Sequence, residues 1–241
     1  PIFPWREGNS FQLLVDGPQF FPRMLVAIAR AEEQVELELY LVEAGACAEA
    51  MVQALVQAAE RGVRVRCLFD DYGSLAFTLT LRQRLTTAGV ELRFYNRLSW
   101  RRWVGNFYRD HRKLLLVDQS LAVVGGTGVT DEFWTPNEDV SEWHEVMVEI
   151  TGPLVLDWQL LFDRQWIANR HRRAWRPASH FGLPRLPRVP STGEGMGRVA
   201  YADADLSAHE QHVVRKIADL LHVPHRAYIA AKLRARDAAG G

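Results

Sequence analysis

Residues 108–130, YRDHRKLLLVDQSLAVVGGTGVT, decide how this chain folds. Two short apolar runs, Lys113–Val117 and Leu121–Val124, flank the turn-prone residues Asp118-Gln119-Ser120. Apolar runs of this length on either side of turn residues predict a β-hairpin. If Gln119 and Ser120 form a two-residue loop, that loop sets the register of the two strands. The register then pairs Asp118 with Leu121, Lys113 with Gly126 and His111 with Gly128.

The first strand of this hairpin carries the spacing H-x-K-x-x-x-x-D, formed by His111, Lys113 and Asp118. Because side chains alternate along a strand, His111 and Lys113 point to one face and Arg112 points to the other. An imidazole and an ammonium group then lie side by side, opposite a glycine-rich strand. Asp118 lies about 16 Å beyond Lys113 along an extended strand. We therefore expect Asp118 to support the site without touching the same ligand.

Such an arrangement suits a phosphate group. The ammonium group of Lys113 can hold the negative charge, and the imidazole of His111 can act as nucleophile or base. Gly125 and Gly126 carry no side chains, so a ligand can approach their backbone closely. We predict a phosphate site in which Gly125, Gly126 and Thr127 bind the substrate.

The flanking sequence alternates between strand-like and helix-like patterns. Residues 35–41 alternate between apolar residues (Val35, Leu37, Leu39 and Leu41) and Glu36, Glu38 and Tyr40, which predicts a strand with one face in the core. Further strands are expected over 11–15, 63–69, 90–95 and 146–150, and helices around 21–28, 52–59, 79–88 and after Pro153. Gly62 and Gly89 are expected to end two of these helices. The repeated β-α-β order predicts an α/β fold, a sheet with helices on both faces.

The composition places few limits on function. Hydrophobic residues make up 48% and charged residues 24%, as in ordinary globular proteins. Lys+Arg and Asp+Glu balance at 29 each, so any basic surface must be local. No apolar run approaches the ~20 residues of a membrane span, and no signal-peptide pattern is present. The chain begins at Pro1 instead of Met, which leaves room for a longer natural N-terminus. We expect a soluble or membrane-surface protein, with Cys47 and Cys67 in its core and free thiols favoured over a disulfide.

The H-x-K-x-x-x-x-D spacing resembles the signature of the phospholipase D superfamily. The resemblance extends from about Gly8 to Trp166. This part of the sequence is similar to the first half of bacterial cardiolipin synthases. It is carried, in order, by GNSFQLLVDGPQFFPRMLVAIARA, QVELELYL, AAERGVRVRCLFDDYGS, RDHRKLLLVD and WHEVMVEITGP. The resemblance implies a phospholipase D-like fold, a mixed β-sheet with helices on both faces.

The same resemblance implies a mechanism. His111 would attack phosphorus to form a phosphohistidine, and Lys113 would hold the phosphoryl oxygens. A second His, from another half of the enzyme, would protonate the leaving alcohol. No cofactor or metal is implied, because cationic side chains supply the charge. Glu145, in WHEVMVEITGP, would orient a catalytic His; the alternative is an exposed strand carboxylate.

One position departs from the family pattern. The family carries an Asn two residues after the position of Gly126, where this chain has Gly128. The lost hydrogen-bond donor is worth about 1–3 kcal/mol if it faces charge. Reduced activity or a changed substrate is expected.

Two other stretches suggest additional roles. Asp70–Ser74 ends a strand, where adjacent carboxylates suggest either a metal or a capped turn, and we favour the turn near the site. Cations and aromatics alternate just before the motif, which suggests a lipid interface, single-stranded nucleic acid binding or a solvated loop. These residues are Arg97, Trp100, Arg101, Arg102, Trp103, Phe107, Tyr108 and Arg109. The family resemblance favours lipid.

The chain divides into three parts. Residues 1–168 form the phospholipase D-like domain with its single motif, and 169–197 form a basic, Pro-rich linker. Residues 198–241 repeat the strand-helix-strand order of 11–41 and are predicted to be the truncated start of a second phospholipase D-like repeat. A C-terminal helix packed on the first domain is the alternative.

The resemblance therefore implies a phosphatidyltransferase of cardiolipin synthase type, acting on anionic, phosphatidylglycerol-like phospholipid at a membrane surface. In this family two motifs normally build one site. The partner of this chain would therefore be a second copy of it or the missing C-terminal half. A phosphodiesterase or nuclease and an inactive half-enzyme remain as alternatives, although nucleic acid is the less favoured partner. The expected location is the cytoplasmic face of the bacterial inner membrane, or the cytoplasm.

Overall fold

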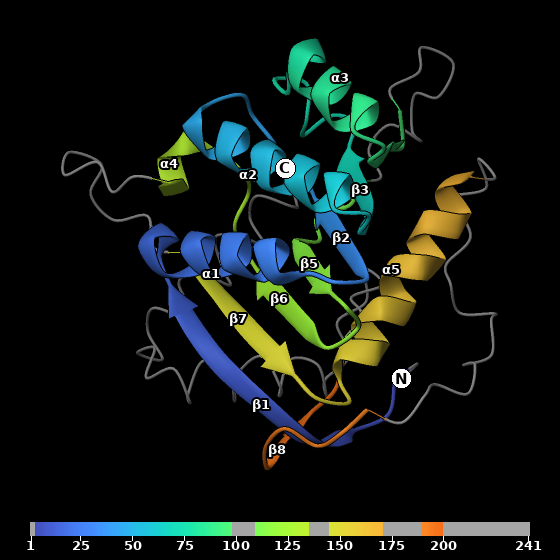
Figure 1. Ribbon diagram of the computed structural model, residues 1–241. Coiled ribbons are helices and arrows are strands. Elements are labelled where there is room, and N and C mark those ends of the chain that lie inside the picture. Colours follow the sequence, from blue (N-terminus) through green and yellow to red (C-terminus); the bar gives the residue numbers. More distant parts are fainter. Residues whose placement is uncertain (1–2, 98–108, 135–144, 171–188, 200–241) are drawn as a thin grey trace, which may run out of the picture. The chain divides into compact units, whose positions relative to one another are not determined.

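The computed structural model describes residues 3–97, 109–134, 145–170 and 189–199. Its strands are β1 (Arg6–Val15), β2 (Gln34–Leu39), β3 (Arg64–Asp70), β4 (Glu91–Tyr95), β5 (Leu114–Val117), β6 (Leu121–Gly125), β7 (Val146–Thr151) and β8 (Gly195–Gly197). In these ranges, eight strands form one sheet in the order β4-β3-β2-β5-β6-β7-β1-β8 (Figure 1). β2, β3 and β4 run parallel, and the other neighbouring strands are antiparallel. The sheet is mixed, as predicted.

Helices cover both faces of this sheet. α1 (Gly17–Arg30) and α2 (Ala46–Glu60) lie side by side over one face (Figure 1). α5 (Val155–Arg170) covers the other face and contacts β5 and β6. Arg66 of β3 contacts Asp163 of α5, whereas its neighbours Val65 and Cys67 belong to the core beneath α1 and α2. Two shorter helices, α3 (Leu79–Thr87) and α4 (Asp131–Trp134), lie in the connections.

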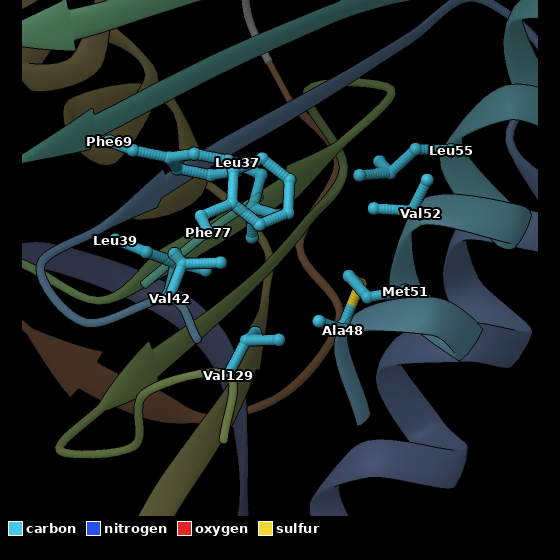
Figure 2. A pocket seen from close by; sticks show the side chains of 10 residues that line it. All are labelled: Leu37, Leu39, Val42, Ala48, Met51, Val52, Leu55, Phe69, Phe77 and Val129. Atoms are coloured by element: carbon cyan, nitrogen blue, oxygen red, sulfur yellow. The ribbon is translucent and has the colours of Figure 1, made fainter. Parts of the chain in front are cut away.

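The core between the sheet and α2 is apolar. Figure 2 shows a small void lined by Leu37, Leu39, Val42, Ala48, Met51, Val52, Leu55, Phe69, Phe77 and Val129. Because these side chains offer no hydrogen-bond partners, a void of this kind stays dry. The two cysteines lie in this core as predicted: both are buried and free. Burial raises the pKa of the Cys47 thiol to about 12.

The prediction that β2 has only one face in the core is wrong. All six residues of β2 are buried, including Glu36 and Glu38. β2 lies between β3 and β5. α5 lies over the face that carries Glu36, because its Asp163 binds Arg66, which in turn pairs with Glu36. Glu36 is paired with Arg66 at 2.8 Å, and a carboxyl oxygen of Glu38 lies 2.9 Å from Arg112. These partners allow carboxyl groups to be buried where the alternation suggested solvent.

The predicted hairpin forms, but the predicted register is wrong by one residue. Val117 pairs with Leu121 and Leu114 with Val124, so the loop contains three residues, Asp118–Ser120. Asp118 and Gln119 adopt positive φ angles of 49° and 52°. The carboxylate of Asp118, in this loop, accepts hydrogen bonds from backbone N–H groups at the start of β2. In the observed register Lys113 lies opposite Gly125, whose N–H donates to the Lys113 carbonyl at 3.3 Å.

The helix ends agree with the prediction. Gly62 and Gly89 follow α2 and α3 with φ angles of 91° and 89°, a region that favours glycine. None of the helices in the described ranges combines the length and apolar character needed to cross a bilayer.

The C-terminal part of the described chain returns to the sheet. β8 comes from the end of the predicted linker and pairs with the start of β1, where Arg6 faces Gly197. Arg198 and Val199 follow β8 and are not in a strand. The remainder of the predicted second repeat, residues 200–241, lies outside the described residues.

Candidate active site

His111 and Lys113 lie in the extended segment that leads into β5, and the structure brings both against Tyr40. The imidazole of His111 stacks on the ring of Tyr40, with 4.1 Å between centroids and 16° between planes. The Nζ atom of Lys113 donates to the His111 carbonyl at 2.7 Å and lies 5.6 Å from the centroid of the same ring. The imidazole and the ammonium group therefore lie against one aromatic ring, and His111 as a residue is exposed.

The surroundings favour a neutral imidazole. Partial burial, followed by the charge of Lys113, lowers the pKa of His111 below its ordinary value of 6.5, against the opposite effects of Asp70 and Asp110. Burial also lowers the pKa of Lys113, although Glu145 and Asp110 raise it. A neutral His beside a cation is the combination that nucleophilic attack on a phosphate ester requires.

Glu145 lies directly before β7, on the glycine side of the site. A Cβ atom at Gly126 would approach its Oε1 atom to 2.1 Å, so the carboxylate occupies the space beside that glycine. Its Oε1 atom accepts from the Val146 N–H at 3.2 Å. Among the described residues, no hydrogen bond joins Glu145 to His111. The orienting role of Glu145 stays a prediction.

The glycines are needed for packing as well as for access. A Cβ atom at Gly125 would lie 2.3 Å from the Val146 carbonyl oxygen and 2.5 Å from the sulfur of Met147. Gly125 and Gly126 remain exposed. Thr127 is fully buried, and its hydroxyl donates to the Gly128 carbonyl at 2.9 Å. Substrate binding by Gly125, Gly126 and Thr127 remains a prediction. Thr127 is the least accessible of the three, because it is buried and its hydroxyl already donates to the Gly128 carbonyl.

Gly128 does not lie opposite His111, contrary to the predicted register. It is buried beside Leu41, where a Cβ atom would come within 2.9 Å of both the Cβ atom and the carbonyl oxygen of Leu41. The family's Asn would therefore require a shift of this backbone.

Asp118 lies at the other end of β5 from Lys113. Its carboxylate accepts hydrogen bonds from the backbone N–H groups of Glu32, Glu33 and Gln34 at 2.9, 2.8 and 2.8 Å. The residue thus connects the hairpin loop to the start of β2 and lies at the far end of β5 from the predicted phosphate site.

The Asp70 turn also has the expected form. Oδ1 of Asp70 accepts from the N–H groups of Tyr72 and Gly73 at 3.0 and 3.1 Å, which makes it a turn residue at the end of β3. Of the predicted cation–aromatic segment, only Arg97 and Arg109 are described. Arg109 donates to Asp70 and lies over Tyr72. Its remaining members, residues 100–108, lie outside the described residues.

Sequence reasoning missed Tyr40 and a buried carboxyl pair, Glu38 and Asp110. Arg112 points away from His111, as predicted, and holds this pair: it lies 2.9 Å from Glu38 and donates to Asp110 at 3.0 Å. Polar residues at alternate positions of an otherwise apolar strand were the available signal. They could equally have faced solvent.

Comparisons with known proteins agree with this fold. The structure is similar to that of Nuc from Salmonella typhimurium, a phospholipase D family member, with a TM-score of 0.53 and 22% identity. The match covers 66% of this chain and 95% of Nuc. A family model described as "Cardiolipin synthase, PLD-like domain" matches residues 24–166, more than half of the chain. The chain therefore belongs to the phospholipase D-like family of cardiolipin synthases.

Two curated relatives are cardiolipin synthases that match this chain over part of their length. Cardiolipin synthase B of Salmonella typhi is 36% identical over 156 residues, which cover 64% of this chain and 37% of that protein. Cardiolipin synthase B of Shigella flexneri is 31% identical over 232 residues, which cover 94% of this chain and 54% of that protein. The chain thus spans about a third to a half of the length of these relatives.

The C-terminal segment, residues 198–241, is covered in part by two of the matches. The alignment with the Shigella protein covers 94% of the chain and so extends into this segment. A model described as "Tellurite resistance protein TerB" matches residues 193–233. The second phospholipase D-like repeat stays a prediction.

Proposed function

We propose that this chain provides one half of the site of a phosphatidyltransferase of cardiolipin synthase type. The observation that supports this most directly is that His111 and Lys113, just before β5, both lie against the ring of Tyr40. A neutral imidazole next to an ammonium group fits nucleophilic attack on a phosphodiester. The substrate would be an anionic, phosphatidylglycerol-like phospholipid.

The proposed reaction has two displacements at one phosphorus atom. A ring nitrogen of His111 attacks the phosphorus, the bond to the headgroup glycerol oxygen breaks, and glycerol leaves with a proton from a second acid. The hydroxyl of another phospholipid then attacks the phosphohistidine, its proton returns to that base, and the phosphorus–nitrogen bond breaks. Two phosphatidylglycerol molecules thereby yield cardiolipin and glycerol.

Lys113 is proposed to balance the charge on the phosphoryl oxygens throughout. Glu145 and Asp110 counteract the effect of burial on its pKa and so help to keep it protonated. The second acid would come from another copy of this chain or from a C-terminal half. The reaction would take place at the membrane surface, with the cytoplasmic face of the bacterial inner membrane as the proposed location.

Product analysis by mass spectrometry tests the proposal. Vesicles of phosphatidylglycerol are incubated with the chain, with His111→Ala and with Lys113→Ala; Arg30→Ala, which removes an exposed cation from α1, is the control. We expect cardiolipin from the intact chain and from Arg30→Ala, and a loss on the order of 10³-fold or more in His111→Ala.

Other products would indicate a different function. Phosphatidic acid would identify water as the acceptor and the protein as a hydrolase. Cleavage of DNA without lipid turnover would identify a nuclease. Equal product from the chain and from His111→Ala would overturn the role of His111.

A further inference from the structure

Tyr40 contacts both groups of the candidate site but has no part in the chemistry proposed above. It is the first residue after β2, and its ring carries the imidazole of His111 at 4.1 Å on its face. The ammonium group of Lys113 lies 5.6 Å from the centroid of the same ring. One aromatic ring therefore contacts the two side chains on which the reaction depends.

The turn after β3 holds the backbone of Tyr40. Gly73 lies so close that a Cβ atom there would be 2.0 Å from the Tyr40 carbonyl oxygen. The N–H group of Val42 donates to the Gly73 carbonyl at 3.1 Å. Only glycine at position 73 allows the backbone of this turn to lie so close to the Tyr40 carbonyl oxygen.

Asp70 connects this turn to the segment that carries His111. Its Oδ1 atom accepts from the N–H groups of Tyr72 and Gly73, and its Oδ2 atom accepts from the Asp110 N–H at 3.1 Å. The residue is buried, with 1% of its surface exposed, so these bonds are shielded from water. One carboxylate therefore sets the distance between the backbone behind Tyr40 and the residue before His111.

We propose that Tyr40 is a positioning residue, whose ring holds the imidazole of His111 flat and also lies against the ammonium group of Lys113, and that Asp70 sets the spacing of the Tyr40–His111 stack. The consequence for catalysis depends on the proposed function, whereas the stack itself does not. Flat stacking restricts rotation of the imidazole, so its nitrogen atoms stay at the edge of the stack. The electron-rich face of the ring also favours a cation above it.

The stack predicts how His111 titrates. Lys113, Asp70 and Asp110 are the charged groups that act on His111 among the described residues; Lys113 lowers its pKa and the two aspartates raise it. Tyr40→Phe keeps the ring and should leave this balance unchanged. Tyr40→Leu keeps the site covered but removes the aromatic face, so the pKa of His111 should fall further.

Nuclear magnetic resonance of the imidazole protons tests the proposal in the full chain, with His111→Ala used to assign the resonance. A proton held over an aromatic ring is shifted upfield. We expect this shift and the titration midpoint of His111 to be the same in Tyr40→Phe as in the intact chain. In Tyr40→Leu the shift should disappear and the midpoint should move to lower pH. Tyr40→Leu that titrates as the intact chain does, with the upfield shift kept, would overturn the proposal.

Asp70→Asn provides a second test that leaves Tyr40 in place. The amide cannot accept all the N–H groups that the carboxylate accepts, so the upfield shift of His111 should decrease; an unchanged shift would overturn the role of Asp70. Where the chain turns over lipid, kcat should fall about tenfold in Tyr40→Leu with little change in KM, because a misplaced nucleophile slows chemistry more than binding. Failure of lipid turnover in every variant would count against the proposed function, and the resonance measurements would still decide whether Tyr40 positions His111.

Discussion

At the scale of single residues, the most unusual feature is the buried carboxyl pair of Glu38 and Asp110. Burial and then the neighbouring Asp110 raise the pKa of Glu38 well above its ordinary value of 4.5. The pKa of Asp110 is lowered: burial opposes this, but the charge of Arg112 and a hydrogen bond with Glu38 outweigh it. Glu38 is therefore the protonated member of the pair, and Arg112 balances the single negative charge.

This pair predicts a stability that depends on pH. Glu38 has a raised pKa in the folded state, so its contribution is fully present below the ordinary glutamate pKa and is lost as pH rises through the folded value. Glu38→Gln keeps the shape and can donate to Asp110 without titrating. Its free energy of unfolding should therefore increase relative to the intact chain as pH rises from acid to alkaline.

Denaturant unfolding of both proteins across this pH range measures the difference. The same change at exposed Glu33 controls for the loss of one surface carboxyl. A Glu38→Gln variant that loses stability relative to the intact chain as pH rises would contradict the assignment of the proton to Glu38.

At the scale of elements, the β5–β6 hairpin is held at both ends. At one end Asp118 accepts hydrogen bonds from three backbone N–H groups at the start of β2, and at the other the Gly125 N–H group donates to the Lys113 carbonyl. The Asp of the motif thus fixes the position of β5, whereas the His and Lys of the motif lie at the opposite end of that strand.

Asp118→Ala should therefore reduce stability more than chemistry. The loss of one acceptor for three N–H groups should lower the free energy of unfolding by about 1–3 kcal/mol. Ser120→Ala, in the same loop, is the control. Activity measured well below the unfolding midpoint should stay within a few-fold of the intact chain. Loss of activity in an Asp118→Ala variant of unchanged stability would contradict this assignment.

At the scale of the whole molecule, the site is assembled from segments distant in sequence. Tyr40 follows β2, His111 and Lys113 precede β5, and Glu145 precedes β7. These elements are neighbours because β5 lies between β2 and β6, and β6 lies next to β7. The described residues supply one imidazole to this site, and the proposed mechanism requires two.

Activity should therefore depend on assembly. We expect turnover per chain to rise with protein concentration in step with dimer formation, measured by light scattering during assay. Addition of His111→Ala chains should lower the activity below the share of intact chains, because mixed pairs lack one imidazole. A monomer that turns over at all concentrations would contradict the shared site.

Much of this fold was predictable because it depends on local pattern. The strands, the helices and their glycine ends follow from the spacing of apolar residues along short segments. The observed β1 to β7, α1 to α3 and α5 agree with these predictions, whereas α4 and β8 were not predicted. The H-x-K spacing predicted that His111 and Lys113 would lie close together. The order of its flanking blocks led to the family that the comparisons then confirmed.

The sequence by itself thus determined the elements, the family and the position of the motif, since each is encoded in neighbouring residues. Only the tertiary structure decided the burial of Glu36 and Glu38, the register of the hairpin and the stack of Tyr40 on His111. Each of these depends on a partner far away in sequence. The glutamates depend on α5, Asp118 on the N–H groups at the start of β2, and Tyr40 on the turn that Asp70 forms. Such contacts are selected by the packing of the whole sheet, which local periodicity does not record.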